Sequence, residues 1–356
     1  MSLTLSTNEA RKRLVSHLGL AQDLRNTKAV LERLRCIQLD PLDVVGTNAD
    51  LVVMARVEEA RRGDVWRDLF PRHAFEHFAK ERCILPASAF PFYRERGHAA
   101  ETPWWRHGER EQRVPKQVVD AVLAEVRERG PITARDLADH GSVDPIDWSG
   151  WKGTAKATSM ALEMLWTTCD IVVAGRTESG AKLYDIPRRA LGPIAGRSPA
   201  EEFDRWALRE RVRAAGLLAR AGGSIWSMLS HARTSHVPEA MVESGELVDV
   251  AIEGSPRRYL AVPEFLRARI ALPDDRVRLL GPLDPLLWDR NLVRHIFNFD
   301  YVWEVYKPAR LRRWGWYVCP LLYRGHLVGR VDVSKARWKL WIEDGRESSD
   351  ARSRSR

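Results

Sequence analysis

The sequence predicts an α+β protein made of tandem winged-helix modules followed by a C-terminal β-rich element. Two observations lead to this prediction. Helical stretches repeatedly give way to two short strands joined by a glycine turn, which is the order of elements in a winged helix. After residue 276, runs of alternating aromatic and aliphatic residues replace the helical pattern and favour a small antiparallel sheet or barrel.

The repeats of this pattern divide the chain into five parts. The tail is charged, rich in Ser and Arg and poor in apolar residues, so we expect it to be disordered. The predicted parts are an N-terminal winged-helix-like module (1–112), a second winged helix (113–192), a third winged helix (193–272), the β element (273–341) and the tail (342–356).

In the first module the apolar spacing predicts four helices. The segment TNEARKRLVSHLG begins with a capping Thr or Asn and ends at a glycine, and TKAVLERLRCI carries an apolar stripe at helical spacing. DLVVMARVEEARR is predicted to form a third helix, and HAFEHFAKERCIL a fourth that ends before Pro86. The helices are therefore expected over 7–19, 27–37, 50–62 and 73–85.

The second module has the fullest winged-helix pattern. VPKQVVDAVLAEVRERG is an amphipathic helix closed by Gly130, and PITARDLADHG predicts a short strand and a small helix capped by Thr133. TAKATSMALEMLWTTC supplies the long third helix, and residues 170–189 give strand, turn and strand as the wing. The third module repeats this order from EEFDRWALRERVRAAG to VPEAMVESGELVDVAIEGSPRRYLAV, with a turn at Gly254.

Charge and composition narrow the class of partner and the compartment. Lys+Arg 57 against Asp+Glu 48 leaves a net charge of +9, which suits a polyanion such as nucleic acid or simply a charged soluble surface. The four cysteines include no CxxC pair, which favours reduced core thiols over zinc or disulfides. There is no signal-peptide core and no long apolar run, so we expect a cytoplasmic protein without a membrane partner.

The stretch CIQLDPLDVVG places two polar side chains, Gln38 and Asp40, in an apolar run. Pro41 disfavours helical geometry at Asp40, and in an extended segment residues two apart share a face. A carboxylate can take a proton from water while an amide holds that water, so the two residues are a candidate hydrolytic pair. The alternative is a turn in which Asp40 caps the next element and Gln38 makes local hydrogen bonds.

Basic and aromatic residues mark candidate DNA contacts in three places. Two lie on the second and third winged helices, where the alternative is an ordinary solvated face or a protein-binding module. The third is LRRWGWYVCP, which resembles a hairpin tip around Gly315, although at least one of its aromatic residues must belong to the core. The candidates are Lys152, Lys156, Arg176, Arg188, Arg257, Arg312, Arg313, Trp316 and Tyr317.

Several other chemistries lack their motifs. His73 and His77 are four residues apart but do not form HExxH, so we expect no metal site. The chain also has no Walker loop, no dinucleotide-binding GxGxxG context and no GxSxG elbow, and we expect no cofactor.

Taken together, several stretches resemble the AlkZ/YcaQ-like family of winged-helix DNA glycosylases, in order over roughly residues 8–337. The resemblance is carried by CIQLDPLDVV, ITARDLADH, YDIPRR, LGPLDPLLWDR, FDYVWEVYKPARLRRWGWYVCPLL and HLVGRVD. It implies tandem winged helices that enclose a DNA-sized cleft, a C-terminal β element and a β-hairpin that probes the lesion, for which 311–318 is the candidate.

The same resemblance assigns roles to the polar pair. Family members carry a QxQ or QxD motif, and Gln38-Leu39-Asp40 matches QxD, the branch associated with alkylated bases and interstrand crosslinks. It implies Asp40 as general base or electrostatic partner and Gln38 as the amide that positions water. The expected enzyme is a monofunctional, monomeric glycosylase acting on damaged double-stranded DNA at the nucleoid. The alternative is a non-catalytic winged-helix DNA-binding protein or transcriptional regulator.

Overall fold

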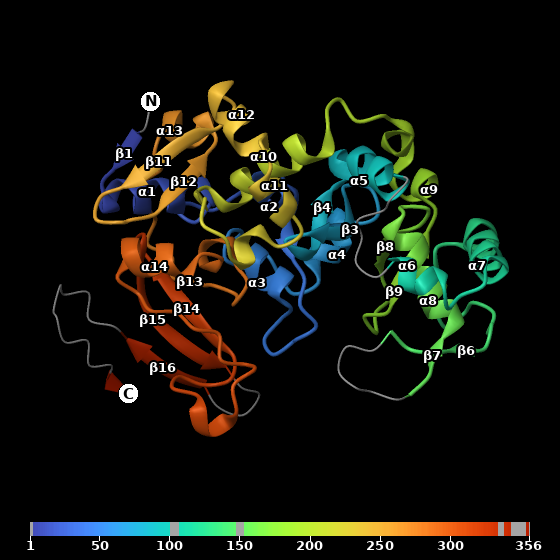
Figure 1. The fold of residues 1–356 in the computed structure, drawn as a ribbon. Helices are drawn as coiled ribbons and strands as arrows, with labels where there is room; N and C mark the ends of the chain where they lie inside the picture. The colour runs from blue at the N-terminus through green and yellow to red at the C-terminus, as the bar shows by residue number, and fades with distance from the viewer. Residues whose placement is uncertain (1–2, 100–106, 147–152, 334–337, 343–353, 356) are drawn as a thin grey trace. The chain divides into compact units, whose positions relative to one another are not determined.

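The computed structural model describes residues 3–99, 107–146, 153–333, 338–342 and 354–355 of the chain. By its internal contacts the chain divides into two compact units. Unit 1 comprises Met1–Val65, Phe78–Cys83 and Asp204–Arg356, and unit 2 comprises Trp66–His77 and Ile84–Phe203. Figure 1 follows the chain from β1 at the N-terminus to β16 near the C-terminus. No described helix is both long and apolar enough to cross a membrane.

The N-terminal part of the chain forms a small sheet of order β2-β4-β3 with helices before it. The side chain of Asn26 caps α2, and Thr47 and Asp50 form a reciprocal capping box at the start of α3. The elements are β1 (Leu3–Leu5), α1 (Thr7–His17), α2 (Thr27–Leu34), β2 (Ile37–Gln38), α3 (Asn48–Met54), α4 (Asp64–Leu69), β3 (Ala74–Ala79) and β4 (Glu81–Pro86).

Two helix predictions in this region need correction. The helix expected over 50–62 covers only 48–54, and the helix expected over 73–85 is wrong, because the segment forms the hairpin β3–β4. Four consecutive side chains of β3 and four of β4 are buried, which leaves no polar face for a surface helix. The chain reverses at Lys80, and Glu81 has a φ of 58°, a left-handed conformation that ends a helix.

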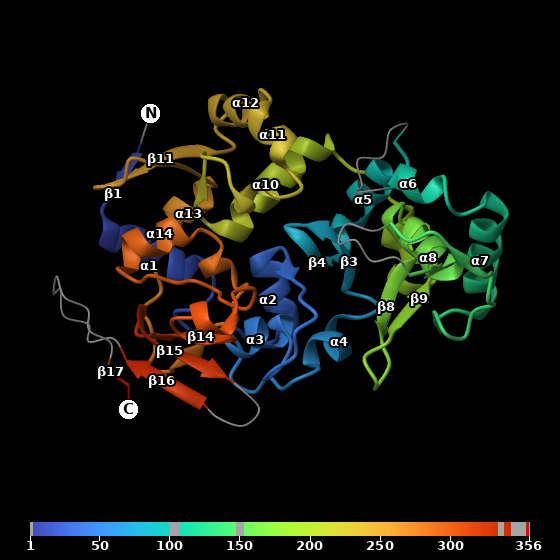
Figure 2. The same ribbon diagram turned by 60° about the horizontal axis from the view of Figure 1, so that its bottom comes forward.

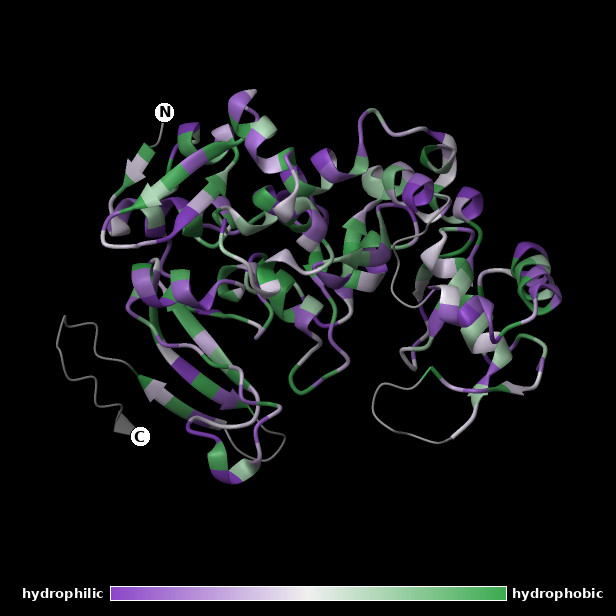
Figure 3. Cartoon of the chain, viewed as in Figure 1, coloured by the Kyte–Doolittle hydropathy of each residue, from purple (hydrophilic) through white to green (hydrophobic). Residues whose placement is uncertain are grey.

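The middle of the chain forms the second winged helix, with sheet order β5-β9-β8 and a separate β6-β7 pair. Figure 3 shows hydrophilic and hydrophobic residues alternating along α7, as its amphipathic sequence predicts. The small helix expected after Thr133 is a turn. The elements are η1 (Ala87–Ala89), α5 (Phe90–Gly97), α6 (His107–Glu111), α7 (Lys116–Arg129), β5 (Ile132–Thr133), β6 (Ser142–Val143), β7 (Ala155–Lys156), α8 (Ala157–Thr167), β8 (Val172–Arg176), β9 (Lys182–Asp185), α9 (Pro187–Leu191) and η2 (Gly192–Gly196).

The third winged helix has sheet order β1-β11-β12-β10. Strand β1 adds to it from the far end of the sequence, pairing parallel with β11 so that Leu3 lies opposite Val250. The elements are α10 (Phe203–Ala215), β10 (Leu218–Ala219), η3 (Ser224–Trp226), α11 (Ser230–Thr234), α12 (Val237–Glu243), β11 (Val248–Ile252), β12 (Arg258–Ala261) and α13 (Pro263–Arg267).

The C-terminal part of the chain is a sheet of order β13-β14-β15-β16-β17, whose β14, β15 and β16 are neighbours in Figures 1 and 2. Helix α14 was not expected, and residues 299–308 contain no strand although their aromatic pattern suggested one. The elements are β13 (Arg278–Leu279), η4 (Pro285–Leu287), α14 (Arg290–Phe297), η5 (Ala309–Leu311), β14 (Val318–Tyr323), β15 (His326–Val333), β16 (Trp338–Ile342) and β17 (Arg354–Ser355).

The α+β fold class with a C-terminal sheet is confirmed. In all three winged-helix sheets the third strand of the module lies between the first and the second, as the order β5-β9-β8 illustrates. The module boundaries stay predictions. The tail expected to be disordered lies outside the described residues, except that Ile342 ends β16 and Arg354–Ser355 forms the short strand β17.

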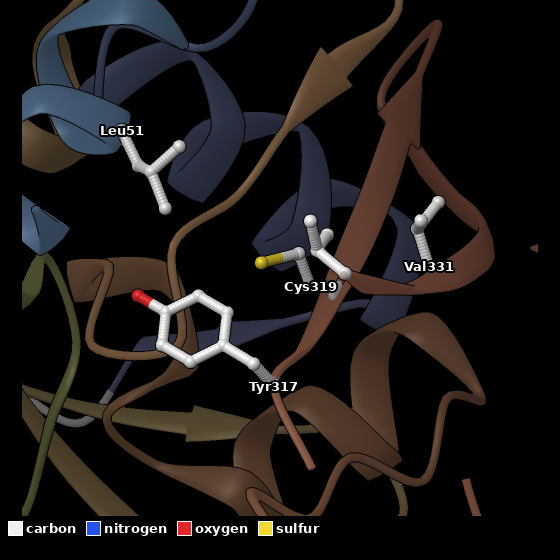
Figure 4. Packing of buried hydrophobic residues seen from close by; sticks show 5 residues of the cluster. Leu51, Tyr317, Cys319 and Val331 are labelled. Atoms are coloured by element: carbon white, nitrogen blue, oxygen red, sulfur yellow. The ribbon is translucent and has the colours of Figure 1, made fainter. Parts of the chain in front are cut away.

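One hydrophobic cluster joins the N-terminal helices to the C-terminal sheet within unit 1. Leu51 of α3 packs with Tyr317, Cys319, Val331 and Val333, all of them buried. Figure 4 shows Tyr317 and Cys319 pointing toward Leu51. Burying a side chain of this size contributes about 1.5–3 kcal/mol. Three residues that follow the QxD motif also pack against this cluster: Leu42, Val44 and Val45.

Candidate active site

The QxD motif lies where strand β2 ends. Gln38 is the last residue of β2, and the N–H of Leu39 donates to the carbonyl of Arg82 at 2.8 Å, which continues the pairing with β4. Asp40 then closes a turn across Pro41, because its Oδ1 accepts the N–H of Leu42 at 2.9 Å. The backbone that leads to Asp40 is therefore extended, the geometry in which residues two apart share one side of a strand.

A buried asparagine fixes the backbone of the motif. Asn48, at the start of α3, donates from Nδ2 to the carbonyl of Gln38 at 2.8 Å and accepts the N–H of Leu283 on Oδ1 at 3.1 Å. A Cβ at Gly281 would lie 2.7 Å from this Oδ1, so glycine is required there. The end of β2 is thus held both by α3 and by the segment before η4.

A buried lysine contacts the Gln38 side chain. Lys80 Nζ donates to Gln38 Oε1 at 3.2 Å and lies 5.2 Å from the centre of the Trp288 ring. Burial lowers the pKa of Lys80; the nearby Cys83 and Glu81 offset part of this decrease, and the positive charge of Arg211 adds to it. Sequence reasoning missed Lys80 because the segment around it was expected to form a helix. No local signal singled out Lys80, because its segment also contains Glu76, Glu81 and Arg82.

The surroundings of Asp40 raise the proton affinity of its carboxylate. Burial raises the pKa of Asp40, and the hydrogen bond from Leu42 offsets part of that rise. Burial also raises the pKa of the Tyr317 phenol, as do the nearby Cys319 and the carboxylates of Asp40 and Asp43. Tyr317 is therefore a neutral neighbour, and Asp40 accepts a proton more readily than an exposed aspartate does.

Some of the predicted DNA contacts are exposed. Lys156 precedes α8 with its side chain 70% exposed, and its Nζ lies 3.8 Å from Asp139. Arg188 in α9 and Arg313 are exposed as well, and Arg313 lies over the ring of Trp314. Trp316 is 37% exposed. These side chains are accessible to a ligand.

Two of the predicted contacts have little exposed surface, 14% of the Arg176 side chain and 1% of Tyr317. Arg176 pairs with the fully buried carboxylate of Glu76 and lies 4.3 Å from the centre of the Trp66 ring. Tyr317 is 1% exposed and belongs to the core cluster, which fits the expectation that one aromatic residue of its segment is core.

The remaining predicted contacts have intramolecular neighbours or lie outside the description. Arg257 lies 3.8 Å from Asp289, and Arg312 Nε donates to the carbonyl of Lys307 at 2.8 Å. Lys152 lies outside the described residues.

The segment 311–318 is not a hairpin. It follows the short helix η5, and the buried carboxylate of Glu304 accepts the N–H groups of Arg313 and Trp314 at 3.1 and 2.7 Å. Gly315 has a φ of 148°, and a Cβ there would lie 2.1 Å from Asp332 Cγ. The segment is therefore a loop fixed by two carboxylates, and the lesion-probing role predicted for a hairpin here loses its structural basis.

One of the two histidines that suggested a metal has other contacts. His77 is buried, its Nε2 lies 3.1 Å from the carbonyl of Thr167, and its ring stacks on Trp166. Within the ranges that the structure describes, no group of three or more His, Cys, Asp or Glu side chains is arranged to hold a metal ion.

Comparisons with a family model and with solved structures bear on the family and the fold of this chain. The sequence matches the family described as DNA glycosylase AlkZ-like over residues 31–348, a span that includes Gln38 and Asp40. The structure is similar to the Streptomyces sahachiroi DNA glycosylase AlkZ, with a TM-score of 0.59 over 98% of this chain and 93% of that chain. The two sequences are 18% identical, so this likeness supports the fold. The family match covers most of the chain, and the protein therefore belongs to the AlkZ-like DNA glycosylases, enzymes that act on DNA.

Proposed function

We propose that the chain hydrolyses the N-glycosidic bond of N7-alkylated guanine in duplex DNA, including guanine joined in an interstrand crosslink. Asp40 is the general base and Gln38 holds the attacking water. The observation that carries this proposal is the pairing of a half-buried carboxylate of raised pKa with a buried amide at the end of β2. A base must be ionised to act yet have appreciable proton affinity, and burial moves Asp40 in that direction.

The chemistry needs few groups. Alkylation at N7 gives guanine a positive charge, so the base departs as a neutral molecule when the C1′–N9 bond breaks. The sugar becomes oxocarbenium-like, and the Asp40 carboxylate stabilises its developing charge. The water oxygen then bonds to C1′ as its proton passes to Asp40.

The crosslink substrate requires an accessible site. A base covalently joined to the opposite strand cannot be flipped into a snug pocket, as ordinary glycosylases require. Asp40 is half-buried and adjoins the exposed Pro41, and Asp43 two residues further is also exposed. A motif on such a loop suits a bulky lesion, which supports this part of the proposal.

We propose a monofunctional reaction that leaves an abasic site. The motif contains no lysine, but the Nζ atom of Lys80 contacts the Gln38 amide, so the product must be tested directly. Lys80 is 6% exposed, which supports water rather than this amine as the nucleophile. Borohydride reduction during turnover should trap no covalent protein–DNA adduct. An adduct that disappears in Lys80→Met would replace the monofunctional assignment with a lyase.

The activity is tested with a duplex containing one N7-methylguanine. Purified protein is incubated with it, and heating in alkali then cleaves the strand at abasic sites. We expect cleavage above a heat-depurination control, and its loss in Asp40→Asn and Gln38→Ala with DNA binding retained. No excision of N7-methylguanine or of a crosslinked duplex by the unaltered chain would contradict the proposal. Loss of binding together with activity would indicate a structural motif.

The partner and the location are further parts of the proposal. The exposed Lys156, Arg188, Arg313 and Trp316 are the proposed contacts to duplex DNA, cations for the phosphates and the ring for stacking. We propose that the protein works as a monomer in the cytoplasm, where its substrate holds it at the nucleoid.

A further inference from the structure

We propose that Lys80 is a positioning residue that orients the side-chain amide of Gln38, so that the NH2 group rather than the carbonyl faces the attacking water. This inference rests on the proposed function, because it concerns the water that Gln38 is proposed to hold.

The orientation follows from donor and acceptor chemistry. A lysine ammonium has three donors and no acceptor, so only the amide oxygen of Gln38 can face it. Lys80 Nζ lies 3.2 Å from Gln38 Oε1. Rotating the amide by half a turn would place its NH2 group against the ammonium, donor against donor. The contact therefore selects one of the two amide orientations, and Nε2 points away from Lys80.

The backbone around Lys80 places its side chain next to Gln38. Lys80 is the single residue between β3 and β4, and its carbonyl accepts the Cys83 Sγ–H at 3.1 Å. Strand β4 pairs with the segment that carries the motif, through the hydrogen bond from Leu39 to Arg82. Gln38 and Lys80 are thus held on adjoining segments of one sheet.

Packing alone does not explain a lysine at this position. Lys80 is 6% exposed, and no described carboxylate lies within ion-pair distance of its Nζ. A buried ammonium without an ion pair is costly, and a Met of similar length would fill the space without that cost. The hydrogen bond to Gln38 and the Trp288 ring are its compensating contacts.

The amide orientation matters for the rate. The attacking water must donate a proton to Asp40, and a donor on its other side keeps the oxygen aimed at C1′. The Gln38 NH2 group supplies that donor. With the carbonyl in its place, Gln38 would accept the second O–H of the water, and no donor would hold the oxygen that attacks C1′. DNA affinity does not depend on this choice.

The test is a double-mutant cycle on the N7-methylguanine duplex, with single-turnover rates and DNA affinity measured for each variant. Lys80→Met should lower the rate about 10- to 100-fold, the scale on which misplacement of a reacting group acts, with affinity unchanged. Lys80→Arg keeps a donor and should recover part of the rate. In a Gln38→Ala background, Lys80→Met should cause no further loss. Lys116→Met, which changes an exposed lysine of α7, is the matched control and should behave as wild type.

The outcomes separate this inference from the proposed function. If Gln38→Ala excises as fast as wild type, the role proposed for Gln38 fails, and with it the basis for orienting that residue. If Gln38→Ala is impaired while Lys80→Met keeps the full rate, or if Lys80→Met costs the same rate with and without Gln38, the positioning role is wrong. Should Lys80→Met not fold, Lys80→Gln is judged by the same criterion, because its amide can donate or accept and leaves the orientation unfixed.

Discussion

The hairpins β3–β4 and β8–β9 occupy the same place in two sheets of the same strand order, and their tips differ in burial. The tip of β8–β9 carries Glu178, Ser179 and Gly180, all exposed to solvent. The tip of β3–β4 is Lys80, which is buried and contacts Gln38. An exposed wing is free to touch a partner molecule, whereas a buried one can only shape its own interior. Winged-helix topology alone therefore does not predict which wing contacts DNA, and we expect only a wing with an exposed tip to do so.

The largest expected effect is a loss of excision when Asp40, next to the region that the buried hairpin tip contacts, is changed. Asp40→Asn removes the proposed base while keeping nearly the same shape, so excision should fall by about 10²- to 10⁴-fold, the usual contribution of general base catalysis. Single-turnover excision of N7-methylguanine measures it. Affinity for the same duplex should change less than about twofold, because no phosphate contact is lost. A large loss of affinity would show that the region around Asp40 also binds DNA, so that chemistry and binding are not separate.

The second expected effect concerns a cation that looked like a DNA contact. Removing Arg176 leaves the Glu76 carboxylate buried and unpaired, and breaking such a pair costs about 3 kcal/mol or more. Arg176→Ala should therefore lower the free energy of unfolding, measured by urea denaturation, and leave the salt dependence of DNA binding unchanged. Normal stability together with weaker DNA binding would show that Arg176 contacts DNA.

The third expected effect is a pH dependence set by Asp40. Its pKa is raised, and the base works only when ionised, so the excision rate should fall as the pH drops through that value. The acid limb should have its midpoint above the ordinary aspartate value of about 3.9 and decline about tenfold per pH unit below it. Rates of the folded enzyme across this range measure the midpoint. The residual activity of Asp40→Asn should lack this limb, and its persistence there would assign the titration to another group.

The smallest expected effects are on DNA affinity, when exposed cations of the second module are removed. Lys156→Ala and Arg188→Ala should each weaken DNA binding a few-fold and reduce the salt slope by about one. Titrations at several salt concentrations measure both quantities. The rate of the bound complex should stay at the wild-type value. Variants that slow the bound complex without changing the slope would show that the second module contributes to the chemistry.

Elements determined by residues close in sequence were predicted correctly, whereas a segment determined by tertiary contacts was not. Helix α7 and the strands β8 and β9 were predicted because their periodicity and turn residues are local signals. The segment 73–85 was misread because alternating and helical spacing are hard to distinguish in a short apolar run, and its burial depends on neighbours distant in sequence. The extended backbone before Asp40 was predictable, since Pro41 imposes it.

The contacts that complete the candidate site could not be read from the sequence. Asn48, Lys80 and Leu283 reach Gln38 or its neighbours through tertiary contacts, and no local pattern marks them. The prediction of a hairpin over 311–318 is wrong for a related reason. Its Arg and Trp residues predicted a projecting tip, whereas the carboxylates of Glu304 and Asp332 hold its backbone in a loop.

The discontinuity of unit 1 has a consequence for synthesis on the ribosome. Most of unit 2 is one uninterrupted stretch, Ile84–Phe203, which can fold as soon as it emerges. The motif loop is made early, but its partners come late: Leu283 for Asn48, and Tyr317 for Leu51 and the residues after Asp40. The contacts that hold the segment after Gln38 are therefore complete only once residues up to Val333 have been made. Until then this segment lacks the long-range contacts that fix it within unit 1.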